Sequence, residues 1–323
     1  MALDHSRLRM LMKVIKEYGV RGDVLTVGVQ DIIDTHENIE ALVRANGFAP
    51  APIPPAERRY RTSKGQRIFK QFFNVDNPMH GDDVFRMLGF GAIHSVDAFD
   101  NDAPTLIHDL NDPLPAEYHG RYDFVVDIGC SEHIFDVRQT MKNLMDALKL
   151  GGVLCYYVPM YGWHNECFHN FQPPLFFDAF AANGFDHMKM YLNYFPKYYL
   201  RDSGKTLWRE YQYGDRTKFR KALHFTHLLF TARKVRQQNG FVSPLMAYYV
   251  HWFEKSNASP AAGNPHEESH YMLENLPAPI KRMLPGLIPI YRVMPYVLSA
   301  PIVDAMIFVK NRRKLQKRER FWL

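Results

Sequence analysis

The stretch "DFVVDIGCSEHIFD" (123–136) joins a nearly continuous apolar run to a group of polar residues. Only Asp127 interrupts the apolar run, which is typical of a strand covered on both faces in a parallel sheet flanked by helices. Ligands of such sheets bind beyond the carboxyl ends of the strands. Glu132 and His133 directly follow this strand, so we expect them to lie at a functional site.

A second interpretation of the same residues is structural. Ser131 is a residue type that begins helices, and Glu132 and Asp136 would then lie near the positive end of a helix dipole. Glu132 and His133 would in that case only begin a surface helix. The two interpretations are compatible, because a helix N-terminus can also border a site.

Strand-like apolar runs and amphipathic helical patterns alternate between residues 20 and about 235. This alternation predicts an α/β fold: a Rossmann-like, doubly wound, mostly parallel sheet with helices on both faces. We expect strands at 24–27, 91–100, 122–129, 153–159, 187–195 and 224–235, and a short strand or turn within 104–115. We expect helices at 4–19, 36–48, 81–89, 136–152 and 173–185.

The pattern predicts one α/β domain over residues 1–235, followed by an extension over 236–323. Residues 49–80 are rich in proline and then basic and aromatic, so we expect an insertion or lid there. The extension contains an apolar segment, 281–309, which prolines interrupt. Because a membrane-spanning helix needs about 20 consecutive apolar residues, we expect this segment to form a helix that packs on protein.

The net charge of +6 comes mainly from the tail "KNRRKLQKRERFWL" (310–323), so it does not imply a nucleic-acid partner. Such a tail can instead rest on an anionic membrane surface, and we keep that contact as an alternative to a solvated end. The three cysteines form no CxxC pair or disulfide framework. We therefore expect a cytoplasmic protein, with peripheral membrane contact as the alternative.

Five segments occur in an order that resembles the class I S-adenosylmethionine-dependent methyltransferases. The resemblance covers roughly residues 20–235 and is closest to a bacterial branch that acts on glycans and small molecules. It implies S-adenosylmethionine as cofactor and S-adenosylhomocysteine as product. The five segments are "LTVGVQDI" (25–32), "IHDLN" (107–111), "YDFVVDIGCSEHIFD" (122–136), "LKLGG" (148–152) and "NECFHNFQPPLFFDAFAANGF" (165–185).

Binding this cofactor requires contacts to an amino-acid end, a ribose and an adenine. A glycine after the first strand lets the backbone approach the ligand closely, and a carboxylate after the second strand suits the ribose hydroxyls, with Asp97 preferred and Asp100 as the alternative. Asp109 suits the adenine amino group, and Gln30 offers a side-chain donor where the superfamily has a glycine amide. The full expected set is Gly28, Gln30, Asp97, Asp109, Asp127, Gly129 and Glu132.

The resemblance places His133 at the methyl-transfer site, where its ordinary pKa suits a general base. His164 and His169, in the aromatic loop "YGWHNECFHNF" (161–171), are rival bases or acceptor contacts. This loop also holds Glu166 and Cys167, which invites a metal interpretation. We do not predict a metal, because the spacing forms no established ligand signature.

We therefore expect an enzyme that transfers a methyl group to a small molecule or sugar in a biosynthetic reaction, at oxygen, with histidine as base. The first loop retains only Gly28 of the usual glycine-rich pattern. Two alternatives follow: a protein of this fold that uses the cofactor for another reaction, or a non-catalytic, membrane-peripheral binding protein. A nicotinamide-dependent dehydrogenase is excluded because "GVQDII" lacks the GxGxxG fingerprint.

Overall fold

The computed structural model describes residues 2–32, 34–60, 79–100, 103–196, 207–213, 224–247, 249–250 and 320–322. The chain divides into two units, Met1–Pro244 with Arg320–Leu323, and Leu245–Glu319. Most of the expected lid and of the expected C-terminal extension lies outside the described residues. Within the described ranges, no helix is long and apolar enough to cross a membrane.

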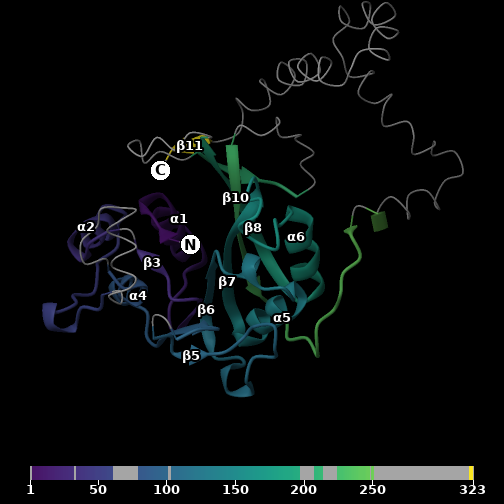
Figure 1. Cartoon of the computed structure of the whole chain (residues 1–323), viewed down its shortest axis with the longest axis horizontal. Helices are drawn as coiled ribbons and strands as arrows, with labels where there is room; N and C mark the ends of the chain where they lie inside the picture. Colours follow the sequence, from purple (N-terminus) through teal and green to yellow (C-terminus); the bar gives the residue numbers. More distant parts are fainter. Residues whose placement is uncertain are drawn as a thin grey trace, which may run out of the picture. The chain divides into compact units, whose positions relative to one another are not determined.

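The first unit is built on a nine-stranded sheet in which the described strands run in the order β11-β9-β8-β10-β7-β6-β2-β4-β5 (Figure 1). A separate two-stranded parallel sheet pairs β1 (Ala2–Leu3) with β3 (Asp31–Ile32). The strands of the main sheet are β2 (Val24–Val27), β4 (Ile93–Asp97), β5 (Leu106–Ile107), β6 (Tyr122–Ile128), β7 (Leu148–Tyr161), β8 (Phe185–Pro196), β9 (Leu207–Tyr211), β10 (His224–Lys234) and β11 (Arg320–Trp322).

The directions of these strands confirm the predicted, mostly parallel sheet. Strands β5, β4, β2, β6 and β7 pair in parallel. Strand β10 is antiparallel to both β7 and β8, so β8 runs in the same direction as β7. The chain leaves β2 toward β4 and β5 and then returns to β6 on the other side of β2. This reversal makes the carboxyl ends of β2 and β6 the switch point at which such sheets bind ligands.

Helices cover both faces of the sheet, as the sequence predicts (Figure 1). Side chains that alternate along β6 belong to two separate cores, with Phe124 and Val126 in one and Val125 in the other. Successive side chains of a strand point to opposite faces, so each core fills one face. The first core includes α1 (His5–Tyr18), α2 (His36–Ala45) and α4 (Gly81–Met87), and the second includes α5 (Val137–Ala147) and α6 (Pro173–Ala182).

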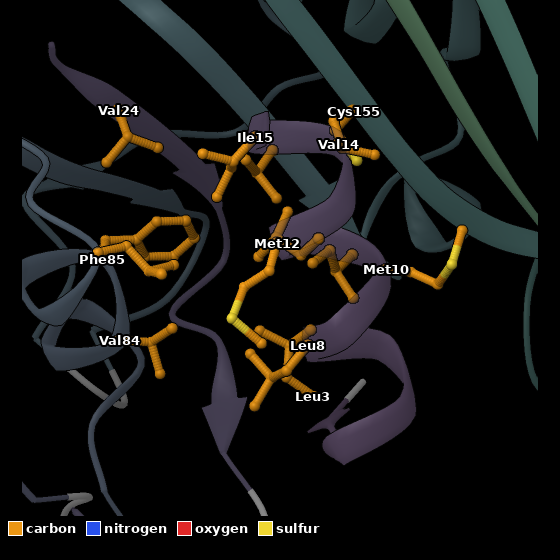
Figure 2. Packing of buried hydrophobic residues seen from close by; sticks show 14 of the residues in the cluster. Leu3, Leu8, Met10, Met12, Val14, Ile15, Val24, Val84, Phe85 and Cys155 are labelled. Carbon is orange, nitrogen blue, oxygen red and sulfur yellow. The ribbon is translucent and has the colours of Figure 1, made fainter. Parts of the chain in front are cut away.

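Helix α1 packs on the sheet through its apolar side. It begins after Asp4, whose carboxylate accepts a hydrogen bond from the Arg7 N–H at 2.8 Å, and ends at Gly19 in the left-handed conformation. Figure 2 shows Met12 and neighbouring side chains of α1 lying close to the side chains of β2 and α4. This core holds α1 and α4 against one face of the sheet beside the switch point.

The structure differs from the sequence prediction at the end of the fourth expected helix, 136–152. Helix α5 ends at Ala147, and Leu148 already pairs with Tyr122 of the sheet. The buried Lys234 ammonium donates hydrogen bonds to the carbonyls of Met145 (2.8 Å) and Leu148 (3.0 Å), which satisfies the end of the helix. The expected helix was therefore wrong over its last turn, because strand pairing outweighs the continuing helical pattern.

The interpretation of Ser131 as a helix cap is also wrong. Residues 131–133 form a single 3-10 turn, and the Ser131 hydroxyl donates a hydrogen bond to the buried Asp127 carboxylate. Asp136 caps α5 instead, accepting a hydrogen bond from the Gln139 N–H at 2.9 Å. Glu132 therefore lies in a loop before α5 and not in its first turn.

Truncating Phe85 tests the core on the α1 face. Phe85 is fully buried and packs edge to face against Phe90, with ring centroids 5.7 Å apart. We expect Phe85→Ala to lower the free energy of unfolding by about 3–5 kcal/mol, because it leaves a cavity. Urea denaturation followed by circular dichroism measures this. The control Leu150→Ala changes an exposed side chain and should stay within about 0.5 kcal/mol of the parent.

Candidate functional site

Gly28 lies where the loops after β2, β4 and β6 meet. Its φ is +71°, and a Cβ atom at this position would lie 2.7 Å from Cys130 Sγ and 3.7 Å from Asp97 Oδ2. The Gly28 N–H donates to the carbonyl of Val96 at 2.7 Å. A side chain would clash with Cys130 Sγ in the space between the two loops, so their close approach at the switch point requires glycine.

Asp97 ends β4 and borders this space. Its Oδ1 accepts a hydrogen bond from the Phe99 N–H at 3.1 Å, while its Oδ2 faces Gly28. The Asp97 carbonyl accepts a hydrogen bond from the His108 N–H at 2.8 Å, which ties the end of β5 to the end of β4. One carboxylate oxygen of Asp97 is thus fixed by the loop and the other is directed toward Gly28.

Asp109 lies in the exposed loop after β5. Its Oδ1 accepts two hydrogen bonds from Asn111, from the backbone N–H at 2.9 Å and from Nδ2 at 2.8 Å. Asn111 Oδ1 in turn accepts a hydrogen bond from the Asp136 N–H at 2.9 Å. These contacts join the loop after β5 to the loop that leads into α5.

Asp127 is fully buried and shapes the turn that follows β6. Its carboxylate accepts hydrogen bonds from the N–H groups of Cys130 (2.9 Å) and Ser131 (3.2 Å) and from the Ser131 hydroxyl. Burial nevertheless raises the pKa of Asp127 to about 6. Gly129, with φ of +79°, allows the turn. The hydrogen bonds of Asp127 are therefore made within the loop, so it supports the floor of the site.

Glu132 is the most unusual charged group of the site. Its side chain is 1% exposed, and neither carboxylate oxygen has a hydrogen-bond partner among the described residues. Burial, and then the charge of Asp127, raise the pKa of Glu132 to about 8. A buried carboxylate without donors is destabilising, and such groups concentrate at functional sites.

The loop after β7 covers Glu132. The backbone carbonyl of Glu132 accepts hydrogen bonds from the N–H groups of Phe168 (2.9 Å) and His169 (3.2 Å) of this loop. This docking brings the aromatic loop 161–171 beside the loop after β6. It also explains why Glu132 is buried although it follows a strand by only a few residues.

His133 lies between Glu132 and solvent. Its side chain is 55% exposed, and its Nε2 is 4.0 Å from Glu132 Oε1. Partial burial lowers the pKa of His133 below its usual value, so the imidazole is neutral at pH 7. A neutral, accessible imidazole is able to accept a proton.

The other two candidate histidines are arranged differently. His169 Nε2 donates to the carbonyl of Phe135 at 3.1 Å, which fixes that ring nitrogen as a donor. His164 is exposed, and its ring contacts Tyr161 edge to face at 6.2 Å. Over the part of the chain that the structure describes, no group of three or more His, Cys, Asp or Glu side chains is placed to hold a metal ion.

The Gln30 side chain is buried and directed back toward β2. Its Nε2 donates to the carbonyl of Val27 at 2.7 Å, so the donor that we expected to meet the cofactor is already used. Its Oε1 has no partner among the described residues. The group that Gln30 leaves available is therefore an acceptor.

Cys130 is a site residue that the sequence analysis did not select. Its Sγ donates to the carbonyl of Val27 at 3.0 Å and lies closest to the space beside Gly28. The only sequence signal was its position directly after Gly129. The structure thus groups Gly28, Asp97, Cys130, Asp127, Glu132 and His133 at one edge of the sheet. The ring contact of His164 is made with Tyr161.

Searches against known proteins found fold similarity only. No protein-family model matches the chain. No curated protein matches it either. Among solved structures, a Burkholderia thailandensis 1,6-didemethyltoxoflavin-N1-methyltransferase, with its substrate and S-adenosylhomocysteine bound, is 14% identical with a TM-score of 0.36, over 72% of this chain and 80% of that one.

Two further solved structures are similar at the same level. A putative methyltransferase from Bacillus halodurans is 12% identical with a TM-score of 0.31, over 70% of this chain and 99% of the other. A branched-chain polyamine synthase from Thermus thermophilus is 12% identical with a TM-score of 0.29, over 75% of this chain and 60% of the other. At these scores, a function for this chain has to rest on its own residues.

The pKa of Glu132 makes stability depend on pH. The folded state binds the Glu132 proton more tightly than the unfolded chain, so the free energy of unfolding decreases as pH rises from 4.5 to about 8. We expect Glu132→Gln to remove this decrease and to be more stable than the parent at pH 8 by more than about 1 kcal/mol. Urea denaturation at pH 5 and pH 8 measures the difference.

The control for this experiment is Glu117→Gln, which changes an exposed carboxylate in a 3-10 turn. It should leave the pH dependence as it is in the parent. A Glu132→Gln protein with the same pH dependence as the parent would show that folding does not change the pKa of Glu132.

Proposed function

We propose that this protein transfers a methyl group from S-adenosylmethionine to a small-molecule acceptor. The observation that carries the proposal is the meeting of the loops at Gly28, where Asp97 Oδ2 lies on one side and Cys130 Sγ on the other. It lies at the switch point of a doubly wound sheet, where the fold class binds nucleotide-like ligands.

The polar groups around this meeting point suit that cofactor. S-adenosylmethionine carries an ammonium and a sulfonium. The unpartnered oxygen of Gln30 is an acceptor for such a group, and so are those of Glu132 once a bound cation has favoured loss of its proton. The Oδ2 of Asp97 is available for ribose hydroxyls, and Asp109 for the adenine amino group. When bound, the cofactor supplies an electrophilic methyl group on its sulfonium.

His133 is the residue that we assign as general base. Its neutral ring would take the proton of an acceptor hydroxyl while the oxygen is aligned for in-line attack. The exposed rings of Phe135 and Phe168 lie edge to face at 5.8 Å and form an apolar rim on the two loops that meet there. Such a rim would exclude water from an acceptor that lies over His133.

The finer aspects of the proposal come from the sequence: the acceptor from the resemblance, and the location from the cysteine pattern. We propose oxygen as the methylated atom, a small molecule or sugar in biosynthesis as the acceptor, and the cytoplasm as the location. Contact of residues 310–323 with an anionic membrane remains a separate hypothesis, and most of that segment lies outside the described residues. Cofactor binding without methyl transfer would favour the alternative of another reaction on the same fold.

Removing the Asp97 carboxylate tests the donor site. We expect Asp97→Ala to weaken S-adenosylhomocysteine binding by about tenfold or more, because it removes charge-assisted hydrogen bonds to the ribose. Isothermal titration calorimetry measures the affinity. Asp100→Ala is the matched comparison, and a larger loss there would assign the ribose to Asp100. Parent protein that binds neither the cofactor nor its product would refute the proposed function.

Replacing His133 tests the base. We expect His133→Asn to lower the rate of methyl transfer by about 100-fold or more while cofactor affinity stays unchanged. Radiolabel transfer from S-adenosylmethionine to an acceptor found by screening measures the rate. His164→Asn serves as the comparison, because that exposed side chain is the rival base and its ring contacts Tyr161. A larger loss in His164→Asn would move the base to the aromatic loop.

A further inference from the structure

A second polar cluster lies on the α1 face of the sheet, separate from the space beside Gly28. Asn193 of β8 and His227 of β10 are directly opposite each other in register. The Tyr157 hydroxyl of β7 donates to Asn193 Oδ1 at 2.8 Å, and the Tyr157 ring stacks on His227 with centroids 4.8 Å apart. All three side chains are buried, so the three strands together form one buried polar cluster.

Two buried N–H groups of this cluster have no acceptor among the described residues. They are Asn193 Nδ2 and Trp163 Nε1. The Trp163 ring contacts His227 at a centroid distance of 4.8 Å, so Trp163 and Asn193 are both neighbours of His227. An unsatisfied buried donor costs about 1–3 kcal/mol, and a native structure that carries two of them in one place calls for a ligand or a water.

Trp208 shows the contrasting arrangement in the same core. Its ring lies 5.9 Å from that of Tyr157, but its Nε1 donates to Ser6 Oγ at 2.8 Å. A buried indole in this part of the molecule is therefore able to find a protein acceptor. The free donor of Trp163 is a local property of its position and not of the core as a whole.

The charges near the cluster favour a ligand oxygen. The Arg7 guanidinium lies over the Tyr157 ring at 5.1 Å, and its Nε donates to the Tyr157 hydroxyl at 3.3 Å. Burial, followed by the charge of Arg7, lowers the pKa of His227 well below its usual value, so its ring is neutral. The partly exposed Asp4 carboxylate lies 3.7 Å from Arg7 Nε.

The cluster is connected to the site described above. Tyr157 pairs with Ile128, which is the residue after Asp127, so the cluster and the Asp127 turn lie at the same level on opposite faces. Trp163 belongs to the loop 161–171, which docks on the Glu132 carbonyl through Phe168. A ligand that contacts Trp163 therefore contacts the loop that covers the candidate site.

We propose that Trp163 Nε1 and Asn193 Nδ2 bind a carboxylate or conjugated carbonyl oxygen of a small-molecule ligand. Such an oxygen only accepts hydrogen bonds, which matches two free donors beside a guanidinium. The assignment of this ligand as the methyl acceptor rests on the proposed function. The binding site itself does not depend on methyl transfer.

The test uses the indole N–H signals of the full chain in heteronuclear NMR, with sodium benzoate and benzylamine as probes. Trp163→Phe assigns the Trp163 signal among the four tryptophans by its loss. We expect benzoate to move the Trp163 signal saturably and benzylamine to leave it in place. The Trp208 signal is the internal control, because its N–H already donates to Ser6.

Asn193→Asp is the matched variant for the second donor. It keeps an oxygen that accepts the Tyr157 hydroxyl and replaces only the Nδ2 donor. We expect Asn193→Asp to weaken benzoate binding by about tenfold or more. We expect a similar loss for Trp163→Phe, which keeps an aromatic ring but lacks the N–H donor. Calorimetry measures both affinities. If Asn193→Asp does not fold, Trp163→Phe still tests the proposal.

Two outcomes would overturn the inference. One is the absence of a saturable shift up to the solubility limit of benzoate, which means that water alone fills the site. The other is an equal response to benzylamine. S-adenosylhomocysteine is titrated separately: binding of it without a benzoate response refutes only this inference. A benzoate response without cofactor binding supports the binding site for a ligand oxygen and refutes the proposed methyl transfer.

Discussion

The parallel pairing of β2 with β6 is the constraint on which the candidate site depends. The register sets Val27 opposite Asp127, so the two strands end together and their loops leave the sheet side by side. Gly28 and Cys130 are then close enough that a Cβ at position 28 would lie 2.7 Å from Cys130 Sγ. A shift of one residue would turn Asp127 to the opposite face and remove the acceptor that holds the turn at Ser131.

Asp127 and Glu132 divide two tasks that carboxylates perform in such sites. Asp127 is buried but receives three hydrogen bonds within its own turn, so its role is to hold the loop. Glu132 is equally buried and receives none from the described residues, so it contributes nothing favourable that the fold itself requires. An ionisable side chain kept buried without a partner is better explained by a cationic ligand, which would favour its ionised form, than by packing.

Much of this arrangement could be predicted from the sequence, because it depends on local patterns. The apolar runs and helical periodicities specify the α/β class, and the ends of the strands indicate Gly28, Asp97 and Glu132. The boundary at Ala147 could not be predicted, since "LKLGG" continues the helical pattern and only pairing with Tyr122 makes Leu148 a strand residue. The burial of Glu132 depends likewise on a distant loop that docks through Phe168.

The unpaired groups of the two sites are complementary in kind. At the candidate site, Glu132 and Gln30 leave oxygens without donors among the described residues. On the α1 face, Trp163 and Asn193 leave N–H groups without acceptors. Because each set would gain by binding the opposite kind of group, a cationic ligand is favoured at the first and an oxygen-bearing ligand at the second. The loop that carries Trp163 also covers Glu132. A ligand bound at Trp163 and Asn193 would therefore contact the loop that encloses Glu132.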